Sequence, residues 1–482
     1  MKLNKYKGHI LAAVLGLSIV AGPGCKKIKE FGDINQNPGQ TTQPITSALL
    51  TNVLAGIGGT AANTRGGLYA QQFSETQYTE TSLYAEPKVD FDGTYAGPLM
   101  DLQKIINFNT DPETAPVAAA YGSNKNQIAT ARILKAYYFW VMTDQYGDIP
   151  YSEALKGEGN TAFDTQQSIY NDLFKELKEA AGQFDGGVPF RGDIMYGGDV
   201  SKWKKFANSL RLVMALRLSK VDAAKGTSEA NDAINSGVFT SNADNAVINY
   251  PGGAYQNPWY ALYNGRKDFA MSDVIDNFLS ATSDPRASVF GSSDMGFPYG
   301  LTRAQAVAFD GASGDKWARI LDEDYRADNS PVTILSYAVV LLARAEARQR
   351  GWVTTGPTAQ ALYEAAIAAS WGEWGISYTP AQLAAYYANS NVAFTAGNEI
   401  QRIAVQRWLA LYPNGLQAWF EWRRTGFPVL TPSPNATNSS KQIPRRYVYG
   451  ARQYSVNKAN TEAAASRIGG DSQDTRVWWD KP

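Results

Sequence analysis

The residues best suited to bind a ligand lie in one short segment, from residue 255 to residue 266. This segment combines aromatic rings with amide and guanidinium groups, namely Tyr255, Asn257, Trp259, Tyr260, Asn264 and Arg266. A flat aromatic ring can stack on the apolar face of a sugar ring, while neighbouring polar groups satisfy the sugar hydroxyls. The same groups can grip a peptide backbone and its side chains. We therefore expect ligand binding here, with an oligosaccharide and an oligopeptide both open.

A second group of aromatic residues, between residues 65 and 100, is the other candidate for ligand contact. It consists of Tyr78, Tyr84 and Tyr95. For any single ring in either group, packing within the protein or against a partner explains its presence at least as well as ligand contact does. The binding hypothesis therefore rests on the two groups as wholes.

Histidine and cysteine are almost absent, and this removes whole classes of chemistry. The one histidine, His9, and the one cysteine, Cys25, both lie near the N-terminus. A Ser-His-Asp triad, a Cys-His pair and a His/Cys zinc site are therefore excluded from the body of the chain. Acid–base catalysis could use only carboxylates, lysine or tyrosine. A carboxylate-based glycosidase would need two acidic residues flanking a cleft, and the sequence selects no such pair.

The acidic residues between 322 and 328 are a weak candidate for a metal site. Asp322, Glu323, Asp324 and Asp328 supply the oxygen ligands that calcium prefers. The spacing lacks the glycine that an EF-hand loop carries at its sixth position. We interpret the cluster as a solvated loop, and we predict no metal site and no cofactor.

A buried charge pair is predicted at Glu346, which lies in the apolar run from Val339 to Ala347. An unpaired carboxylate in such a run would be costly. Arg423 and Arg424 are the suggested partners. We interpret the pair as structural rather than catalytic.

Two further aromatic patterns are predicted to serve packing. Trp203, Phe206 and Leu210 recur at helical spacing, which is typical of a core-facing stripe. Trp478 and Trp479 at the C-terminus are expected to dock the end of the chain onto the body.

Helices in pairs account for much of the chain between residues 126 and 411. Their apolar residues recur at steps of three and four, and Asp199 is a suitable N-cap. We predict helices over Asn126–Tyr146, from near Asp164 to Phe184, from Asp199 past Met214, and over Glu229–Asn235, Ile334–Arg350, Thr358–Trp374 and Glu399–Leu411. Repeated helix–turn–helix units of this size indicate tetratricopeptide-like stacking, although no regular 34-residue repeat is present.

Long stretches without helical periodicity separate these pairs, chiefly residues 65–100, 250–330 and 425–482. Loops of that length are usually functional. The expected fold is thus mainly α-helical, a tetratricopeptide-like helical-repeat scaffold with long irregular loops. The 482 residues are 44% apolar and 12% aromatic, and no Gly/Ser-rich or Pro-rich linker splits them. We predict a single domain from residue 44 to residue 482.

The first residues have the pattern of an export signal. Lys2, Lys5 and Lys7 precede the apolar run Ile10–Ala21, which is too short to span a bilayer comfortably. Cleavage before Cys25 would leave this cysteine as the first residue, where a bacterial lipoprotein carries its acyl chains. We predict a signal peptide over residues 1–24 and a polar, lipid-anchored tether over residues 25–43. An ordinary secretory peptide with an incidental cysteine is the alternative.

The charge balance argues against nucleic acid as a partner. The chain has 45 basic and 45 acidic residues, and loss of the three signal lysines leaves 42 basic residues against 45 acidic ones. Phosphate binding needs a basic footprint, which this composition does not supply.

Several longer segments occur in order over nearly the whole mature chain. They are YGDIPYSEAL at 146–155, DIMYGGDVSKWKKFANSLRLVMALRLS at 193–219, SDPR at 283–286, LLARAEARQRGW at 341–352, QRWLALYPNGLQAWFEWRRTGFP at 406–428, IPRRYVY at 443–449 and DTRVWWD at 474–480. Each alone is a weak motif. Together they resemble the SusD/RagB family of Bacteroidetes.

This resemblance implies a nutrient-binding lipoprotein on a mostly helical, tetratricopeptide-like scaffold. It implies attachment to the outer membrane through a lipid anchor, with the body exposed at the cell surface. It also implies a partner, a SusC-type TonB-dependent β-barrel transporter, on which the protein acts as a lid that captures nutrient for import. No catalysis is implied.

Three functional classes follow, of which the nutrient-capturing lipoprotein is favoured. A secreted carboxylate-based glycoside hydrolase and a structural adaptor that touches only the transporter are the alternatives. Family members serve systems that import glycans or oligopeptides, and the aromatic loops suit either. The slight acidity of the chain argues against a highly anionic polysaccharide, unless a local basic patch forms around Arg266, Lys267, Arg303 or Arg319.

Overall fold

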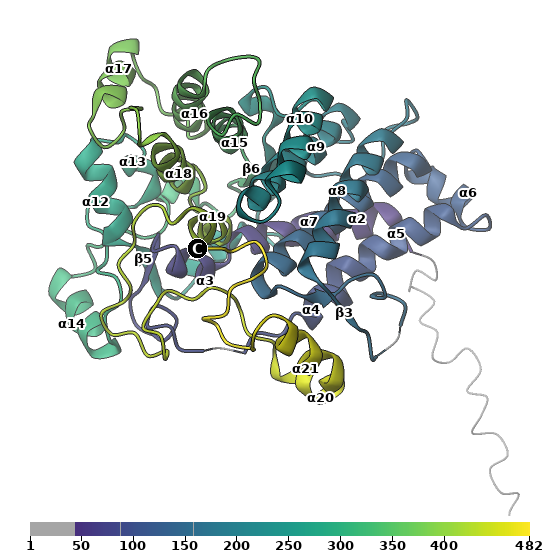
Figure 1. Cartoon of the computed structure of the whole chain (residues 1–482), viewed down its shortest axis with the longest axis horizontal. Coiled ribbons are helices and arrows are strands. Elements are labelled where there is room, and N and C mark those ends of the chain that lie inside the picture. Colours follow the sequence, from purple (N-terminus) through teal and green to yellow (C-terminus); the bar gives the residue numbers. More distant parts are fainter. Residues whose placement is uncertain (1–43, 87, 158) are drawn as a thin grey trace, which may run out of the picture. The chain divides into compact units, whose positions relative to one another are not determined.

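Pairs of helices in contact make up the centre of the computed structural model, which describes residues 44–86, 88–157 and 159–482. The predicted signal peptide, the tether and Cys25 lie outside the described residues. Within each pair the two helices pack against one another, and α8 also contacts α9, α9 contacts α15, and α15 contacts α18. The pairs are α7 (Asn124–Tyr146) with α8 (Gln166–Gln183), α9 (Val200–Arg217) with α10 (Ala223–Ser236), α15 (Tyr337–Gln349) with α16 (Ala359–Glu373), and α18 (Glu399–Ala410) with α19 (Gly415–Thr425). This arrangement agrees with the predicted tetratricopeptide-like stacking (Figure 1).

Side-chain caps explain why these helices begin where they do. The Asp199 carboxylate accepts hydrogen bonds from the backbone N–H groups of Ser201 and Lys202, as its predicted role as N-cap requires. Thr165 and Thr358 cap α8 and α16 in the same way. Most predicted helix ends are therefore correct to within two residues.

Two predicted helix starts are wrong. Helix α10 begins at Ala223, six residues before the predicted Glu229, because Asp222 caps it with a bond from Lys225 N. Residues Val332–Leu335 form a strand rather than the first turn of α15, which begins after its cap Ser336. A short apolar run fits a strand and a buried helix equally well, so periodicity alone could not separate them.

The stretches predicted to be irregular contain many short helices, so that prediction was wrong in its extent. A helix shorter than about 12 residues depends on tertiary packing and leaves a weak periodic signal. These helices are α3 (Thr64–Tyr69), α4 (Asp92–Thr94), α11 (Pro258–Tyr263), α12 (Asp273–Thr282), α13 (Ala287–Phe290), α14 (Arg303–Ser313), α20 (Ala451–Val456) and α21 (Lys458–Arg467). Further helices outside the predicted pairs are α2 (Thr46–Ala61), α5 (Met100–Thr110), α6 (Ala115–Ala118) and α17 (Pro380–Ala388). Single π or 3-10 turns are η2 (Tyr95–Leu99), η3 (Ala119–Tyr121), η4 (Leu218–Lys220), η5 (Asn242–Asp244) and η6 (Glu323–Tyr325).

Short antiparallel strand pairs join distant parts of the described chain. Strand β1 (Phe73–Glu75) pairs with β5 (Phe269–Met271), and Glu75 lies opposite Phe269. The other two pairs are β2 (Ile149–Pro150) with β3 (Phe163–Asp164), and β4 (Ala246–Ile248) with β6 (Val332–Leu335). The β1–β5 pair brings together the two loop regions that carry the predicted ligand residues.

The core is rich in aromatic side chains, as the sequence predicts. Trp203, Phe206 and Leu210 are buried, so this stripe packs inside the protein. Trp479 is also buried, and its Nε1 donates to Asp144 Oδ1 at 2.6 Å, while Trp478 packs against the ring of Tyr170. The last tryptophans thus hold the C-terminus against α7 and α8, as expected.

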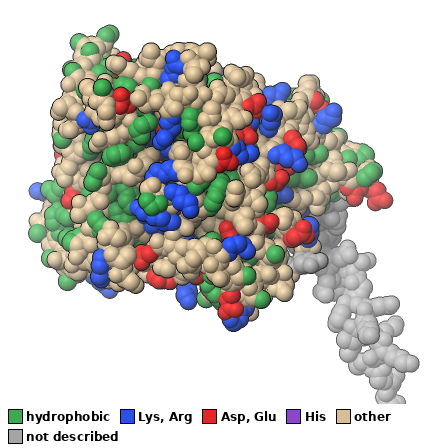
Figure 2. All heavy atoms as spheres, viewed as in Figure 1, with side chains coloured by type: hydrophobic (Ala, Val, Ile, Leu, Met, Phe, Trp, Pro, Cys, Tyr) green, Lys and Arg blue, Asp and Glu red, His purple; other side chains and the backbone are tan. Residues whose placement is uncertain are grey.

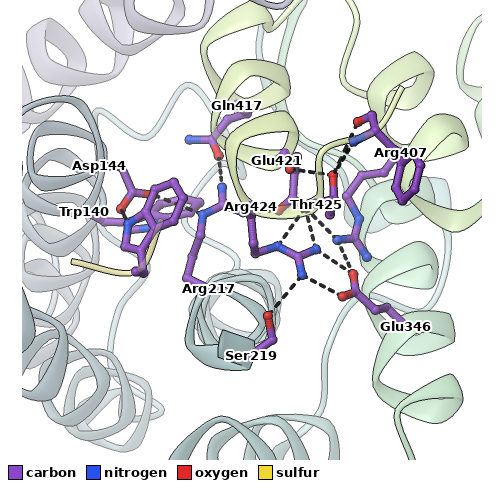
Figure 3. Close-up of polar contacts among 12 residues, drawn as sticks. Trp140, Asp144, Arg217, Ser219, Glu346, Arg407, Gln417, Glu421, Arg424 and Thr425 are labelled. Atoms are coloured by element: carbon purple, nitrogen blue, oxygen red, sulfur yellow. Dashed lines mark hydrogen bonds and ion pairs between the residues drawn. The ribbon is translucent and has the colours of Figure 1, made fainter. Parts of the chain in front are cut away.

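A buried network of arginines and carboxylates connects five helices (Figure 3). Glu346 on α15 receives two bonds of 2.6 Å from Arg424 on α19 and one of 2.8 Å from Arg407 on α18. Glu421 on α19 pairs with the same two arginines and with Arg217 on α9, which also bonds Asp144 on α7. Of the two partners suggested for Glu346, Arg424 is correct. Arg423 instead donates to the carbonyl oxygens of Asp144 and Arg445.

The network keeps its carboxylates ionised. Burial by itself raises the pKa of Glu346, but the guanidinium groups of Arg424 and Arg407 outweigh it and hold this pKa well below its ordinary value. Asp144, Glu346 and Glu421 balance the charges of Arg217, Arg407 and Arg424. Breaking such a buried pair is costly because it leaves a charge without compensation.

Charged groups are mixed over the face shown in Figure 2. Basic and acidic side chains alternate over its right-hand part, and apolar side chains gather left of centre with lysine or arginine between them. None of the helices in the described part of the chain combines the length and the apolar character that a bilayer crossing needs.

We predict that Glu346→Gln lowers the free energy of unfolding at pH 7 by about 3–5 kcal/mol, because Arg407 and Arg424 lose their shared countercharge. Chemical denaturation measures this loss. Because the pKa of Glu346 is depressed in the folded state, its contribution is present above the unfolded pKa and is lost as the pH falls towards the folded value.

The matched control is Glu462→Gln, which removes an exposed partner of Lys458. It should change stability by less than about 1 kcal/mol. An unchanged free energy of unfolding in Glu346→Gln, together with loss of ligand binding, would refute the structural role of Glu346.

Candidate functional site

The two predicted aromatic groups come together at the end of the β1–β5 pair. Just beyond β1, Thr76 N donates to the Asp268 carbonyl at 2.9 Å, and Thr76 Oγ1 donates to the Lys267 carbonyl at 2.6 Å. These bonds hold the loop after β1 beside the loop before β5. They place Tyr78, from one predicted group, next to Arg266, from the other.

Tyr78 stands at the surface between two arginines. Its side chain is 43% exposed, and its ring centroid lies 5.5 Å from the guanidinium carbon of Arg266 and 5.0 Å from that of Arg303. Both distances are in the range of cation–π contacts. We call Tyr78, Arg266 and Arg303 the Tyr78 platform.

The two arginines of the Tyr78 platform differ in their charge balance. Arg266 Nε donates to Asp268 Oδ2 at 2.6 Å, which compensates its charge. Arg303, the first residue of α14, is exposed and has no ion pair or side-chain hydrogen bond with any residue that the structure describes. Its guanidinium donors are therefore available to an acceptor on a ligand.

Neighbouring basic residues contribute less to this surface than the sequence suggested. Lys267 pairs with Asp315 at 3.0 Å, and Arg319 pairs with the same carboxylate at 3.1 Å. The basic patch considered in the sequence is thus largely compensated, except at Arg303. Sequence reasoning included Arg303 only in that patch, because 25 residues or more separate it from either aromatic group.

A buried carboxyl group closes the loop that carries Tyr78. Glu75 is 6% exposed, and its Oε2 accepts hydrogen bonds from Ser82 N and Ser82 Oγ, both at 2.8 Å. Burial raises the pKa of Glu75 to about 7, although the hydrogen bonds from Ser82 offset part of the effect. This link spans the loop from Thr76 to Thr81 and positions its exposed tyrosine.

Three other residues of the first predicted group lie at the surface. Tyr255 is 61% exposed, Tyr260 is 37% exposed, and Asn264 is exposed. Each is accessible to a ligand or to a partner protein. Their role in binding stays a prediction.

Asn257 and Trp259 have clear structural roles. Asn257 is fully buried as the N-cap of α11, where Oδ1 accepts from Trp259 N at 2.7 Å and Nδ2 donates to the Ser330 carbonyl at 2.8 Å. Trp259 is 2% exposed and packs edge-to-face on Phe73, with ring centroids 5.6 Å apart. Neither side chain belongs to the exposed surface around Tyr78.

Tyr84 and Tyr95 also anchor loops within the protein. Tyr84 is fully buried, and its hydroxyl accepts a hydrogen bond from Ser433 N at 2.9 Å. Tyr95 is half-buried, packs on Phe139, and donates its hydroxyl to the Pro150 carbonyl. The aromatic richness of these loops thus serves packing as much as exposure, and sequence alone could not distinguish the two uses.

The acidic cluster from 322 to 328 is engaged in local structure. Asp322 caps the η6 turn by accepting from Asp324 N, and Glu323 pairs with Arg326 at 3.2 Å. Within the described residues, no group of three or more acidic, histidine or cysteine side chains has the proximity that would hold a metal ion.

Comparison with known proteins establishes the family. A family model described as starch-binding, associating with the outer membrane, matches residues 38–450, which is most of the sequence. The chain belongs to the SusD-like family. By this description, SusD-like proteins bind glycan and associate with the outer membrane, so nutrient binding rather than catalysis is the supported role.

Solved structures of SusD-like proteins share the fold. A chitin-binding protein is 29% identical, with a TM-score of 0.77 over 91% of this chain and 100% of that one. A SusD homologue from Bacteroides uniformis is 25% identical, with a TM-score of 0.78 and the same coverage. A chitin-binding SusD homologue from Flavobacterium johnsoniae, 24% identical with a TM-score of 0.76 over 90% of this chain and 98% of that one, supports the fold alone. No curated protein sequence matches the chain. The predicted family and the mainly helical fold are confirmed.

We predict that Glu75→Gln removes part of the pH dependence of stability. The pKa of Glu75 is raised to about 7 in the folded state, so its stabilising protonation is complete below the unfolded value and is lost as the pH rises through about 7. The free energy of unfolding of the wild type should therefore fall more steeply than that of the variant between pH 5 and pH 8, on the order of the shift itself.

Thermal unfolding of both proteins across this pH range measures the difference. Glu80→Gln is the control, because Glu80 lies in the same loop and is exposed. Parallel pH profiles for the wild type and Glu75→Gln would contradict the prediction.

Proposed function

We propose that this protein captures oligosaccharide at the outer membrane and holds it on the Tyr78 platform for delivery to a SusC-type TonB-dependent transporter. The exposed ring of Tyr78, with the unpaired guanidinium of Arg303 beside it, carries the proposal. A sugar ring stacks on the aromatic face, and the arginines donate to its hydroxyl or carbonyl oxygens. The protein binds its ligand without changing it.

Two observations favour a glycan over a peptide as ligand. The family description names starch, and a relative that is 29% identical over its whole length is called a chitin-binding protein. The chemistry of the platform agrees, because donors beside a flat ring suit neutral hydroxyl and acetamido groups. Asp268 compensates Arg266, so the platform does not require an anionic polymer.

The position at the membrane follows from the N-terminal pattern. We propose that Cys25 is lipidated and anchors the body at the cell surface, where the protein acts as a lid on its transporter. The family's association with the outer membrane supports this position. The transporter is a proposed partner on the same ground.

We predict that Tyr78→Ala and Arg303→Ala each weaken binding of short chito- or malto-oligosaccharides about tenfold or more, because each removes one of the two kinds of contact. Isothermal titration calorimetry with the purified protein measures the change. Tyr378→Ala is the matched control, since Tyr378 is a tyrosine of similar exposure, 38%, outside the platform.

Different outcomes of this titration separate the parts of the proposal. Unchanged affinity in both platform variants would move the site elsewhere, with exposed Tyr255 and Tyr260 next to test. Release of shorter sugars during the titration would favour the hydrolase. Absence of glycan binding, both alone and in a complex with the transporter, would favour the adaptor.

We predict that Cys25→Ser releases the protein from the membrane fraction into the soluble fraction without changing its thermal unfolding temperature. The substitution removes the acceptor of the acyl chains and touches nothing in residues 46–482, which form one compact unit. Fractionation of expressing cells measures the release. Retention of Cys25→Ser in washed outer membranes would show that the anchor is not this cysteine.

A further inference from the structure

A cavity of about 340 Å³ lies away from the Tyr78 platform, where the helical stack meets the loops. Strand β6 and the start of α15 form one wall, and the ends of α16 and α18 form another. Residues 321–331 and the connection from α18 to α19 complete the lining. The volume is at the lower end of the range for pockets that hold small molecules.

Three polar atoms that line this cavity have no hydrogen-bond partner among the described residues. They are Glu373 Oε2, Trp374 Nε1 and Asn414 Nδ2, and all three are buried. A buried polar group without a partner costs about 1–3 kcal/mol, so such groups are normally satisfied. Three of them around one cavity indicate that its occupant supplies the missing hydrogen bonds.

The orientation of these groups is set by the surrounding fold. Asn414 is the N-cap of α19, where its Oδ1 accepts from Gln417 N at 3.4 Å and leaves Nδ2 free. Glu373 and Trp374 end α16. Burial raises the pKa of Glu373 to about 7, with neighbouring Thr333 and Ser336 offsetting part of this effect. A carboxyl group in this state can both donate and accept hydrogen bonds near neutral pH.

The rest of the lining is largely apolar and includes aromatic rings. Trp259 and Tyr412 line the cavity together with Val339 and Leu411, and all four are buried. A ring-shaped ligand with an apolar face could pack against these groups while its edge meets the polar atoms. Burial of Trp259 thus places it in this cavity rather than on the outer surface.

The cavity has a mouth at the surface. Asp324 and Pro331 line it and are exposed, while Tyr325 and Trp374 are half-buried. Tyr325 donates its hydroxyl to the Trp374 carbonyl at 2.9 Å, and their rings lie 5.7 Å apart. A small molecule can therefore enter beside this aromatic pair.

We propose that the cavity binds one neutral sugar residue, with its ring against Trp259 and Tyr412 and its hydroxyl or acetamido groups bonded to Glu373, Trp374 and Asn414. The sugar class rests on the proposed function, and the site itself rests on the cavity and its unpartnered polar atoms. A neutral ligand fits because no cation lines the cavity within the described residues and because its acid is uncompensated. The cavity would thus recognise a single residue, apart from the oligomer on the Tyr78 platform.

The test is titration of the purified protein with N-acetylglucosamine and with glucose, followed by ligand-observed NMR. Trp374→Phe removes one donor and keeps an aromatic ring, so we expect about tenfold weaker binding. Ala410→Leu fills part of the cavity and should also weaken binding. Trp371→Phe is the matched control, because its buried Nε1 is likewise unpartnered on the same helix but does not line this cavity.

The outcomes separate this proposal from the proposed function. Monosaccharide binding that is weakened in Trp374→Phe and Ala410→Leu, but kept in Trp371→Phe and Tyr78→Ala, supports the cavity site. Binding that is unchanged in Trp374→Phe and Ala410→Leu overturns it. No monosaccharide binding by a protein that still binds oligosaccharide overturns the cavity site and leaves the proposed function standing. A crystal structure with saturating sugar and only water in the cavity also overturns it.

Discussion

The buried ion network is the interaction on which the arrangement of the helical stack depends. Its members come from helices that are far apart in sequence, and Glu346 bonds arginines 61 and 78 residues away. Hydrophobic packing alone tolerates small shifts of one helix on another, whereas bidentate arginine–carboxylate pairs accept few geometries. Each charge is also buried, so a misplaced helix would leave a charge without its partner. The network thus couples the positions of α9, α15, α18 and α19.

The position of α19 is passed on to the ligand-binding surface by close backbone contact. Helix α3 packs on α19 where Gly66 and Gly67 meet Gly415 and Leu416, and a Cβ on Gly66 or Gly415 would collide with the facing backbone. Helix α3 leads directly into β1, which pairs with β5 and places Tyr78 beside its arginines. A rigid centre therefore orients a platform built on loops. The cavity beside α16 and α18 has the same foundation.

Sequence reasoning was most successful where a signal is local. Helix periodicity and caps such as Asp199 placed the paired helices, and the apolar surroundings of Glu346 correctly implied an arginine partner. Ordered motifs identified the family. The same reasoning could not distinguish Tyr78, which is exposed, from Tyr84, which is fully buried. Both are tyrosines in one loop, and exposure depends on which distant segment covers the ring.

The amino-acid sequence by itself determined the family, the mainly helical class, the lack of histidine chemistry in the body of the chain and the segments in which binding residues lie. These properties depend on residue type and on spacing along the chain. Only the tertiary structure decided that Tyr78 meets Arg303, that Trp259 faces a cavity, and that Glu373 and Asn414 share it. Such groupings join residues separated by 40 to more than 200 positions. They arise from strand pairing and helix packing, which no local pattern encodes.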